Sequence, residues 1–429
     1  MDKVTFAAVG DVFMTRRLPE KRYKGFDELK ALIESHDVKF ANLEITVHRR
    51  EGYPGAFSGG TWAMTAPEAM DDLKDYGFNI YNAANNHSMD YSHNGLLATM
   101  RHLTERDMNF AGIGENLGDA SAPAFVECPE GRVAVVAASS SYHESWMAGD
   151  SRPDMMGRPG LNHLRNNTVF HVTSEHMKAL EEIAEATLIN DQRNASIKEG
   201  FAIKEDGFMF GNYKFVEDEK EYKETTVNKT DMDRIIASIK DAKLLSDYVC
   251  VSIHSHQMGF ARKDYPADFL REFAHKCIDA GAIAILGHGP HIMRGIEVYN
   301  GGIIFYSLGD FLFQNDTPSH EPSDFFTKYS LGSSDRVGTA LNKRSKNNTI
   351  GLGVNPEVWR SVVASFTAEN GKLTEVKLHP IEMGFDLPSY RKGLPALSRD
   401  EDTIRRMAEL SSEFGTEISF ENGVGIVKL

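Results

Sequence analysis

The sequence predicts a layered α/β fold. Short apolar runs of strand character alternate with amphipathic helical segments along much of the 429-residue chain. Several of these runs end at a glycine, a histidine or an acidic residue, which is typical of open α/β sheets that bind ligands at their strand ends. With 41% hydrophobic and 25% charged residues, the composition is ordinary for a globular protein and allows a large core.

The alternation is clearest in the first third of the chain. An apolar periodicity of three to four residues predicts a helix at 26–35, and Pro67 and Gly77 mark the start and end of the next helix. Strands are predicted at 4–9, 38–43, 78–84, 110–114 and 132–138, and helices at 26–35, 67–76 and 92–106.

The pattern loosens after residue 143. We interpret residues 144–245 as an insertion that caps one edge of the functional site, which is expected at the strand ends. It would contain a long helix at 174–194, a hairpin within 201–215 and a charged surface run at 216–226. A polar segment at 314–355 is predicted to be a mobile loop, within one domain that spans 1–429. The remaining predictions are helices at 231–245, 266–280 and 400–414, strands at 247–253, 282–286 and 302–308, and hairpins turning at Asn370-Gly371 and Asn422-Gly423.

Charge and cysteine content exclude several classes of protein. The net charge of −15 disfavours nucleic acid and anionic membranes as general partners, because both require a basic surface. An anionic small molecule, peptide or polymer held in a local basic pocket stays possible. Cys128, Cys250 and Cys277 are too few for a disulfide framework. No apolar run is long enough to span a membrane and no signal peptide precedes the first strand, so we expect a cytoplasmic protein. The oligomeric state is not predicted.

The stretch 282–313 contains the strongest functional signal. Its first apolar run ends in Gly-His-Gly-Pro-His, which puts His288 and His291 at the carboxyl end of a buried strand. Glycine permits close backbone approach there, and imidazole is a common metal ligand and proton carrier. The alternative is that both histidines are hydrogen-bonded turn residues.

Other strand ends carry residues of the same kind. Each lies at or shortly after an apolar run, so they are expected to converge on one edge of a sheet. Two carboxylates, one amide and three imidazoles would suit two divalent cations with mixed oxygen and nitrogen ligands. The predicted ligands are Asp11, Glu44, Asn86, His254, His288 and His291.

Recognisable motifs are spread over nearly the whole chain. They are GDVFMTRR at 10–17, NLE at 42–44, NNHSMDYS at 85–92, AGIG at 111–114, RPGLNHLR at 158–165, SIHSH at 252–256, GHGPH at 287–291, YSLGDFLF at 306–313 and FGTEISFENGVGIVKL at 414–429. Together they resemble the CapA family of poly-γ-glutamate capsule biosynthesis proteins, which have a calcineurin-like metallophosphoesterase fold. The resemblance implies a four-layer α/β-β/α sandwich with insertions.

The resemblance implies roles for individual residues. Asp11, Glu44, Asn86, His254, His288 and His291 would hold one or two divalent ions (Mn, Fe or Zn). A metal-activated water would attack an amide (γ-glutamyl or peptide) or a phosphoester bond, with His87 as the proton donor to the leaving group and Asp11 and His291 as further catalytic residues. Arg16, Arg17 and Asn85 would bind the substrate, although the arginines could instead form surface ion pairs. His256 and His163 are interpreted as structural.

The chain departs from the family pattern at three places. Phe13 stands where the broader pattern has a histidine ligand, Gln257 and Met258 stand where a glutamate is usual, and Gly289 replaces a common histidine. Two alternatives follow. One is a metal-independent peptide epimerase, without a cofactor, that uses Asp11 and a histidine as paired acid and base. The other is a non-catalytic component of capsule synthesis that binds an acidic polymer.

Overall fold

Two large sheets form the centre of the protein in the computed structural model, which describes residues 3–20 and 22–429. Residues 1, 2 and 21 of the predicted domain range lie outside the described residues. The larger sheet has ten strands. Its order is β25 (Ile418–Glu421), β26 (Val424–Val427), β23 (Lys372–Glu382), β22 (Arg360–Glu369), β1 (Val4–Phe13), β2 (Val38–Leu43), β5 (Ile80–Asn82) and β6 (Phe110–Ala111), with β21 (Asp310–Phe313) on β1 and β24 (Ala396–Leu397) on β23.

The second sheet has six strands and packs face to face against the first. Its four inner strands are parallel, and an antiparallel strand closes each edge. Its order is β19 (Met293–Tyr299), β20 (Gly302–Leu308), β18 (Ala284–His288), β15 (Tyr248–His254), β9 (Gly131–Ser139) and β8 (Ala124–Cys128). The sequence patterns did not predict strands β8, β19 and β21.

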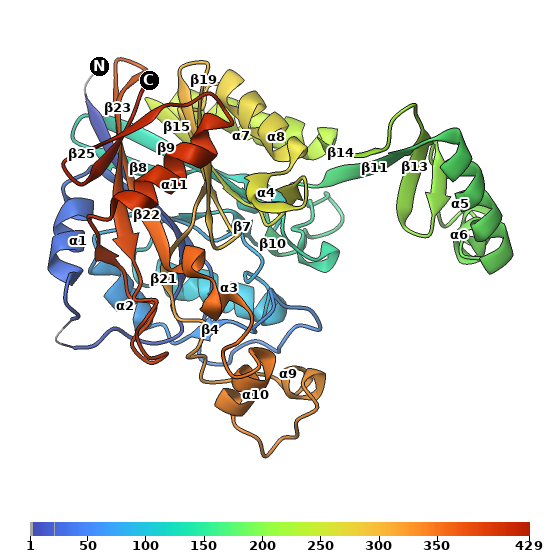
Figure 1. Cartoon of the computed structure of the whole chain (residues 1–429), viewed down its shortest axis with the longest axis horizontal. Coiled ribbons are helices and arrows are strands. Elements are labelled where there is room, and N and C mark those ends of the chain that lie inside the picture. Colours follow the sequence, from blue (N-terminus) through green and yellow to red (C-terminus); the bar gives the residue numbers. More distant parts are fainter. Residues whose placement is uncertain (1–2, 21) are drawn as a thin grey trace.

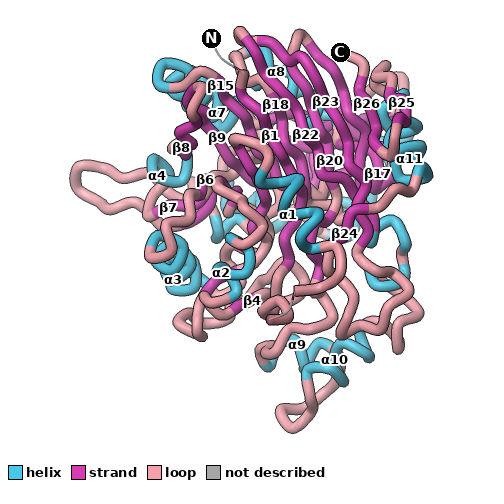
Figure 2. The backbone as a smooth tube through the Cα atoms, turned by 90° about the vertical axis from the view of Figure 1, so that its left-hand side faces the viewer, coloured by secondary structure: helices cyan, strands magenta, loops and turns pink. Residues whose placement is uncertain are grey.

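Three apolar layers explain why the sheets and helices stack. Buried residues such as Phe6 and Phe40 from the first sheet and Val135 and Leu286 from the second form the core between them. The outer face of the larger sheet is covered by α1 (Phe26–Glu34) and α2 (Ala69–Lys74), and that of the smaller sheet by α7 (Lys229–Leu245) and α8 (Asp268–Asp279). Figures 1 and 2 show this helix-sheet-sheet-helix order, so the predicted four-layer fold is confirmed.

Local sequence signals predicted most of the elements in these layers. Both Asn-Gly turns have positive φ at both residues, 52° and 79° at 370–371 and 53° and 86° at 422–423, as the tight hairpin turn requires. Cys250 and Cys277 are buried core residues and all three cysteines are free. Around the layers lie α3 (Ser92–Thr104), α4 (Leu117–Ser121), α11 (Glu401–Ser412) and the short strand pairs β3 (Thr46–Val47) with β4 (Met64–Thr65), β7 (Ile113–Gly114) with β10 (Gly160–Leu161), and β16 (Met258–Gly259) with β17 (Arg262–Pro266).

The inserted segment is shorter than predicted and forms an arm. Residues 166–227 build a separate four-stranded sheet with two helices, and Figure 1 shows them extending away from the main sheets. Helix α7 is not part of the arm, because its apolar side packs into the main core. The predicted helix at 174–194 is two helices, since Leu188 adopts a left-handed conformation (φ 55°). The arm contains β11 (Asn166–Val172), α5 (Ser174–Thr187), α6 (Asp191–Lys198), β12 (Phe208–Phe210), β13 (Tyr213–Glu217) and β14 (Tyr222–Val227).

A buried ion-pair cluster joins the arm to the core. Asp231, near the start of α7, accepts three hydrogen bonds from Arg165, through the backbone N (2.9 Å), Nε (2.8 Å) and Nη2 (2.9 Å). Arg234 Nη1 donates to it at 2.8 Å, and His163 Nε2 lies 3.4 Å from it. Burial would raise the pKa of Asp231, but these partners hold it well below its usual value. His163 therefore belongs to this cluster and not to the strand-end site.

The segment predicted to be a mobile loop contains two helices. Helices α9 (Ser323–Lys328) and α10 (Val337–Arg344) lie side by side beyond the loop end of the sheets in Figures 1 and 2. Their apolar faces pack against Trp62 and Tyr91 of the body. We call residues 314–353 the 314–353 lobe.

Candidate metal centre

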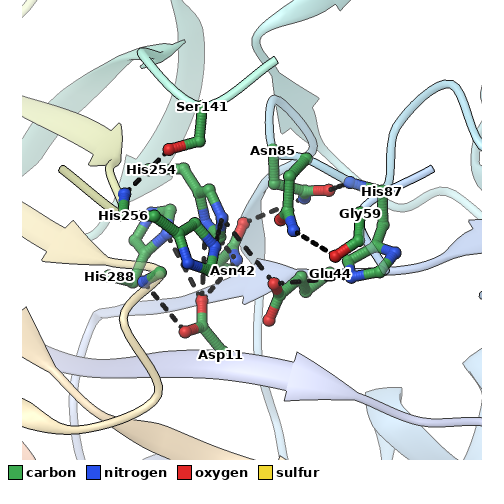
Figure 3. A network of polar contacts seen from close by, with 12 residues as sticks. Asp11, Asn42, Glu44, Gly59, Asn85, His87, Ser141, His254, His256 and His288 are labelled. Carbon is green, nitrogen blue, oxygen red and sulfur yellow. Dashed lines mark hydrogen bonds and ion pairs between the residues drawn. The ribbon is translucent and has the colours of Figure 1, made fainter. Parts of the chain in front are cut away.

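The carboxyl ends of the parallel strands bring the polar residues together, but from two facing sheets and not from one edge of a single sheet as predicted. Asp11 lies near the end of β1, Glu44 directly follows β2, and His254 and His288 end β15 and β18. Since β15 and β18 are in register, His254 is paired with His288 across the sheet. Figure 3 shows the side chains of Asp11, Glu44, His254 and His288 pointing toward one another.

Two Gly-Asp motifs lie side by side in this site. Strand β1 continues past Val9 to Phe13, with a register shift at Gly10, because Gly309 packs directly against it. A Cβ on Gly10 would lie 1.8 Å from Gly309 O, so only glycine fits there. This contact pairs Asp11 with Asp310 in neighbouring strands. Asp310 was not among the predicted ligands, although it follows an apolar run and a glycine just as Asp11 does.

Asp11 is completely buried, and both its oxygens accept hydrogen bonds. Asn42 Nδ2 donates to Oδ1 at 2.6 Å, and the backbone N of Gly289 donates to Oδ2 at 2.9 Å. Oδ1 also lies 3.4 Å from His288 Nδ1 and 3.7 Å from His254 Nδ1. Burial would raise the pKa of Asp11, but the contacts with the histidines and Asn42 outweigh it and lower the pKa.

The histidines form a compact buried group. His254 Nδ1 lies 2.9 Å from His288 Nδ1, and His254 Nε2 lies 3.2 Å from His256 Nε2. Burial and the neighbouring imidazoles lower the pKa of His254 well below its usual value, and burial lowers the pKa of His256 to about 3. Neutral imidazole is the form that binds metal ions. His256 therefore lies within the site, contrary to its interpretation as a structural residue.

Glu44 and Asp310 have carboxylate oxygens that lack partners. Among the described residues, three buried carboxylate oxygens have no hydrogen-bond partner. They are both oxygens of Glu44 and Oδ2 of Asp310. Burial, followed by the charges of other carboxylates, raises the pKa of Glu44 well above its usual value, and burial raises the pKa of Asp310 to about 6. Buried carboxylates without partners are costly, and a bound cation would remove that cost.

Ligand atoms gather in three groups that suit a cation. Within each group the atoms lie within 4.8 Å of one another, and His254 belongs to two of the groups. The donor set is carboxylate oxygen and imidazole nitrogen, which suits Mn, Fe or Zn. The residues therefore fit the predicted divalent ions. The groups are Asp11 with His254 and His288, Glu44 with His254 and His256, and Asp11 with Glu44, His291 and Asp310.

His87 and His291 are each oriented by a buried carboxylate. His87 Nδ1 lies 2.7 Å from Asp90 Oδ2, and His291 Nδ1 lies 2.9 Å from Asp310 Oδ1. The Nε2 atoms of both histidines lie 3.9 Å from Glu44 Oε1. His291 has a positive φ of 58°, a strained conformation for a non-glycine residue. Burial would lower the pKa of His291, but Asp310 and Asp11 raise it above its usual value.

The arrangement agrees with the comparisons to known proteins. Residues 5–315 match the family described as "Bacterial capsule synthesis protein PGA_cap". The chain belongs to the PGA_cap family. The predicted resemblance to CapA is therefore confirmed, and a role connected with poly-γ-glutamate capsule synthesis is the coarse function that membership implies.

Individual relatives extend this result. A Sinorhizobium fredii (strain NBRC 101917 / NGR234) protein named "Uncharacterized protein y4sH" is 34% identical over 450 residues, covering 100% of this chain and 94% of the relative. "PGA biosynthesis protein CapA" of Bacillus subtilis (strain 168) is 26% identical over 317 residues, covering 73% of this chain and 64% of the relative. "Capsule biosynthesis protein CapA" of Bacillus anthracis is 23% identical over 320 residues, covering 73% of this chain and 60% of the relative.

Within the described ranges, no helix is both long and apolar enough to cross a lipid bilayer.

The two asparagines of this PGA_cap chain's NNH motif face different surroundings. Asn86 Oδ1 is buried without a hydrogen-bond partner among the described residues, as a free ligand atom would be. Asn85 is completely buried, and its side chain donates to Leu43 O (2.8 Å) and accepts from the His87 backbone N (3.0 Å). The predicted contact of Asn85 with substrate is therefore wrong, because its polar atoms brace the loop that carries His87.

The predicted substrate arginines lie outside the site. Arg17 forms a bidentate ion pair with Asp72, from Nε to Oδ2 at 2.7 Å and from Nη2 to Oδ1 at 2.8 Å. Arg16 donates to the backbone oxygen of Tyr390. Both line a cavity of about 800 Å³ that includes neither His87 nor His291. The ion-pair alternative describes Arg17 correctly. Local sequence could not decide this, since the partner Asp72 lies on a different element.

A second cavity, of about 320 Å³, opens above His87 and His291. Phe13 lines it where the family pattern has a histidine, and its ring packs against His87 at 5.1 Å between centroids. Most of the other lining residues come from loop 59–61 and the 314–353 lobe, and the arm contributes none. The lobe, and not the predicted cap, therefore covers the site in the described part of the chain. Gln257 Oε1 accepts from the hydroxyls of Ser140 and Ser255, and its Nε2 donates to the backbone oxygen of Ser140, so its amide is hydrogen-bonded within the protein.

Proposed function

We propose that the protein is a metal-dependent hydrolase that cleaves an amide bond of an acidic, γ-glutamyl-type peptide or polymer, or a phosphoester bond. The observation that carries the proposal is the buried convergence of unpartnered carboxylate oxygens of Glu44 and Asp310 with imidazoles. Burying these carboxylates together costs free energy because they have no partners, and a bound cation would remove that cost.

The residues that would hold one or two divalent ions are the six predicted ligands with two additions. Asp310 and His256 join because their ligand atoms lie in the same groups. An ion bound there would supply a water of lowered pKa and a positive charge for the developing oxyanion. The full set is Asp11, Glu44, Asn86, His254, His256, His288, His291 and Asp310.

His87 is suited to donate a proton to the leaving group. Its Nδ1 is held by Asp90, so its Nε2 points toward Glu44 and the cavity. A fixed orientation is what a general acid requires, and when the ring is doubly protonated Nε2 carries the proton that it gives to the leaving group. Asp310 orients His291 in the same way, so that its Nε2 is turned toward Glu44 and is available as an ion ligand. Phe13 and Phe313 line the cavity beside both histidines and exclude bulk water.

The substrate class rests on the relatives. Two of them are named for PGA and capsule biosynthesis, and others are named as probable polyglutamine synthesis accessory proteins. An amide bond in an acidic glutamyl chain is therefore our first choice, and a phosphoester is the second, because the ion-assisted chemistry is the same for both.

The epimerase alternative is not supported by the geometry. It requires Asp11 to exchange a proton with substrate, yet both oxygens of Asp11 accept hydrogen bonds inside the protein and Asp11 does not line the cavity above the site. Non-catalytic binding of an acidic polymer is left as an outcome of the experiment below.

The test is a metal assay combined with hydrolysis. Protein purified without chelator is expected to contain one or two Mn, Fe or Zn ions per chain and to release glutamate from γ-glutamyl oligomers or phosphate from a generic phosphoester. His288→Ala should lose metal and activity. His176→Ala is the control, because His176 is 61% exposed on the arm. Stoichiometric metal without hydrolysis of either substrate would favour the binding component. Absence of both metal and hydrolysis under metal-supplied conditions would refute the proposal.

A further inference from the structure

The cavity above His87 and His291 has two cations at its rim. Lys328 is the last residue of α9 and Arg344 is the last residue of α10, and both line the cavity together with the two histidines. The volume of about 320 Å³ is at the low end for small-molecule sites, so it suits the end of a peptide or a short acyl group.

Neither cation has an ion-pair partner within the described residues. Arg344 donates to two neutral acceptors, Thr61 Oγ1 at 2.5 Å and Asn315 Oδ1 at 3.4 Å. Its guanidinium also lies 5.8 Å above the ring of Phe325. Because guanidinium has five N–H donors, these contacts orient it and leave donors free. Lys328 lies 5.9 Å from the Tyr329 ring and is exposed.

The acidic groups near the rim do not neutralise the two cations. Asp316 lines the cavity, but among described residues it forms no ion pair within 4.0 Å. Glu321 is partly buried, and its Oε2 accepts from the backbone N of Trp62 at 3.2 Å. Burial raises the pKa of Glu321 to about 8, against the lowering effect of the Trp62 hydrogen bond and the nearby Arg344 charge, and Glu321 does not line the cavity. The rim therefore has a surplus of positive charge on a chain whose net charge is −15.

The lobe holds the cations in place. Phe325 and Leu341, from its two helices, pack into one apolar cluster with Trp62 and Tyr91 of the body. Trp62 lies next to Thr61, the acceptor for Arg344, so the cluster and the hydrogen bond fix the same loop. Rigid placement of this kind lowers the ordering cost of binding a charged ligand.

We propose that Arg344, assisted by Lys328, binds a free carboxylate of the substrate beside the reacting bond and selects for acidic substrates. Arg344 is suited to paired contacts with the two carboxylate oxygens, and Lys328 adds a single charge. This is the role that the sequence analysis gave to Arg16 and Arg17. The inference rests on the proposed hydrolase function, whose substrate it specifies.

The experiment compares charge-removing variants with a matched control. Arg344→Gln and Lys328→Gln are tested against Lys346→Gln, which removes the same charge from an exposed residue of the lobe that does not line the cavity. Isothermal titration calorimetry measures binding of N-acetyl-γ-glutamyl-glutamate and of its fully amidated, neutral form to metal-supplied protein. Melting temperature and metal content show whether each variant is folded and loaded.

Arg344→Gln should weaken binding of the acidic dipeptide about 10- to 100-fold, as expected for a lost charge-assisted pair, and Lys328→Gln should weaken it less. Binding of the neutral form and the Lys346→Gln variant should change less than about twofold. In hydrolysis assays the loss should appear in KM and not in kcat.

The proposal is overturned if the acidic dipeptide does not bind the native protein, or if it binds Arg344→Gln and Lys346→Gln equally. If binding depends on Arg344 but no bond is cleaved, the carboxylate site stands and the proposed hydrolase function fails. If hydrolysis occurs without dependence on Arg344, the hydrolase function stands and this inference fails.

Discussion

Gly59 gives a steric test of the position of His87. A Cβ added to Gly59 would lie 2.5 Å from His87 Cε1, 2.7 Å from His87 Nε2 and 2.6 Å from Asn86 Nδ2. The backbone of Gly59 does not have a left-handed φ, so alanine fits the backbone and only the side-chain contact is changed. Ordinary carbon contacts need about 3.5 Å, so the ring must move by about 1 Å.

His87 cannot make this movement freely. Its Nδ1 is bound to Asp90, and Asp90 also accepts from the backbone N of Gly59 at 3.0 Å and of Ala63 at 2.7 Å. Gly59→Ala should therefore cost about 1–3 kcal/mol of stability, as overpacking does. A displacement of about 1 Å at a catalytic group should lower kcat about 100-fold.

The assay is steady-state hydrolysis with metal content and melting temperature measured on the same samples. Gly338→Ala is the control, because no atom lies within 4 Å of its added Cβ and alanine is favourable in helix α10. If Gly59→Ala folds, binds metal and keeps kcat within about threefold of the native value, the inferred position and role of His87 are wrong.

Three further predictions concern stability. Asp231→Asn should cost about 3–5 kcal/mol in urea unfolding, because it weakens a buried cluster, whereas Asp233→Asn, on the exposed face of α7, should change stability by less than about 0.5 kcal/mol. The pKa of Asp231 is lowered in the folded protein, so its contribution is complete above the unfolded pKa of about 3.9 and is lost as pH falls toward the folded pKa. The stability difference between native protein and Asp231→Asn should therefore be constant from about pH 5 to 7 and shrink below about pH 4, and a constant difference down to pH 2 would contradict the assignment. Chelation should lower the melting temperature, since an ion at 100 times its Kd stabilises by about 2.7 kcal/mol. Differential scanning calorimetry should show this loss for His176→Ala and not for His288→Ala.

The sequence alone determined the layered fold, both Asn-Gly hairpins and the strand ends that carry the site. These features are local: side-chain periodicity follows from helix and strand geometry, and a turn depends on the φ that its own residues allow. Parallel strands of one sheet bring their carboxyl ends to one edge, which groups Asp11 with Glu44 on the ten-stranded sheet and His254 with His288 on the six-stranded sheet. The docking of the two sheets then brings the two pairs together.

Only the tertiary structure decided which other residues join them. Asp310 lies beside Asp11 because Gly10 and Gly309 are in direct contact. His256 contacts His254 from a loop whose conformation is not predicted by its own residues. The same holds for Arg17, which pairs with a distant aspartate. It also holds for Arg344, which reaches the cavity because its helix packs on Trp62. Contacts between segments far apart in the chain depend on how the layers dock, and that information is not contained in any single stretch of sequence.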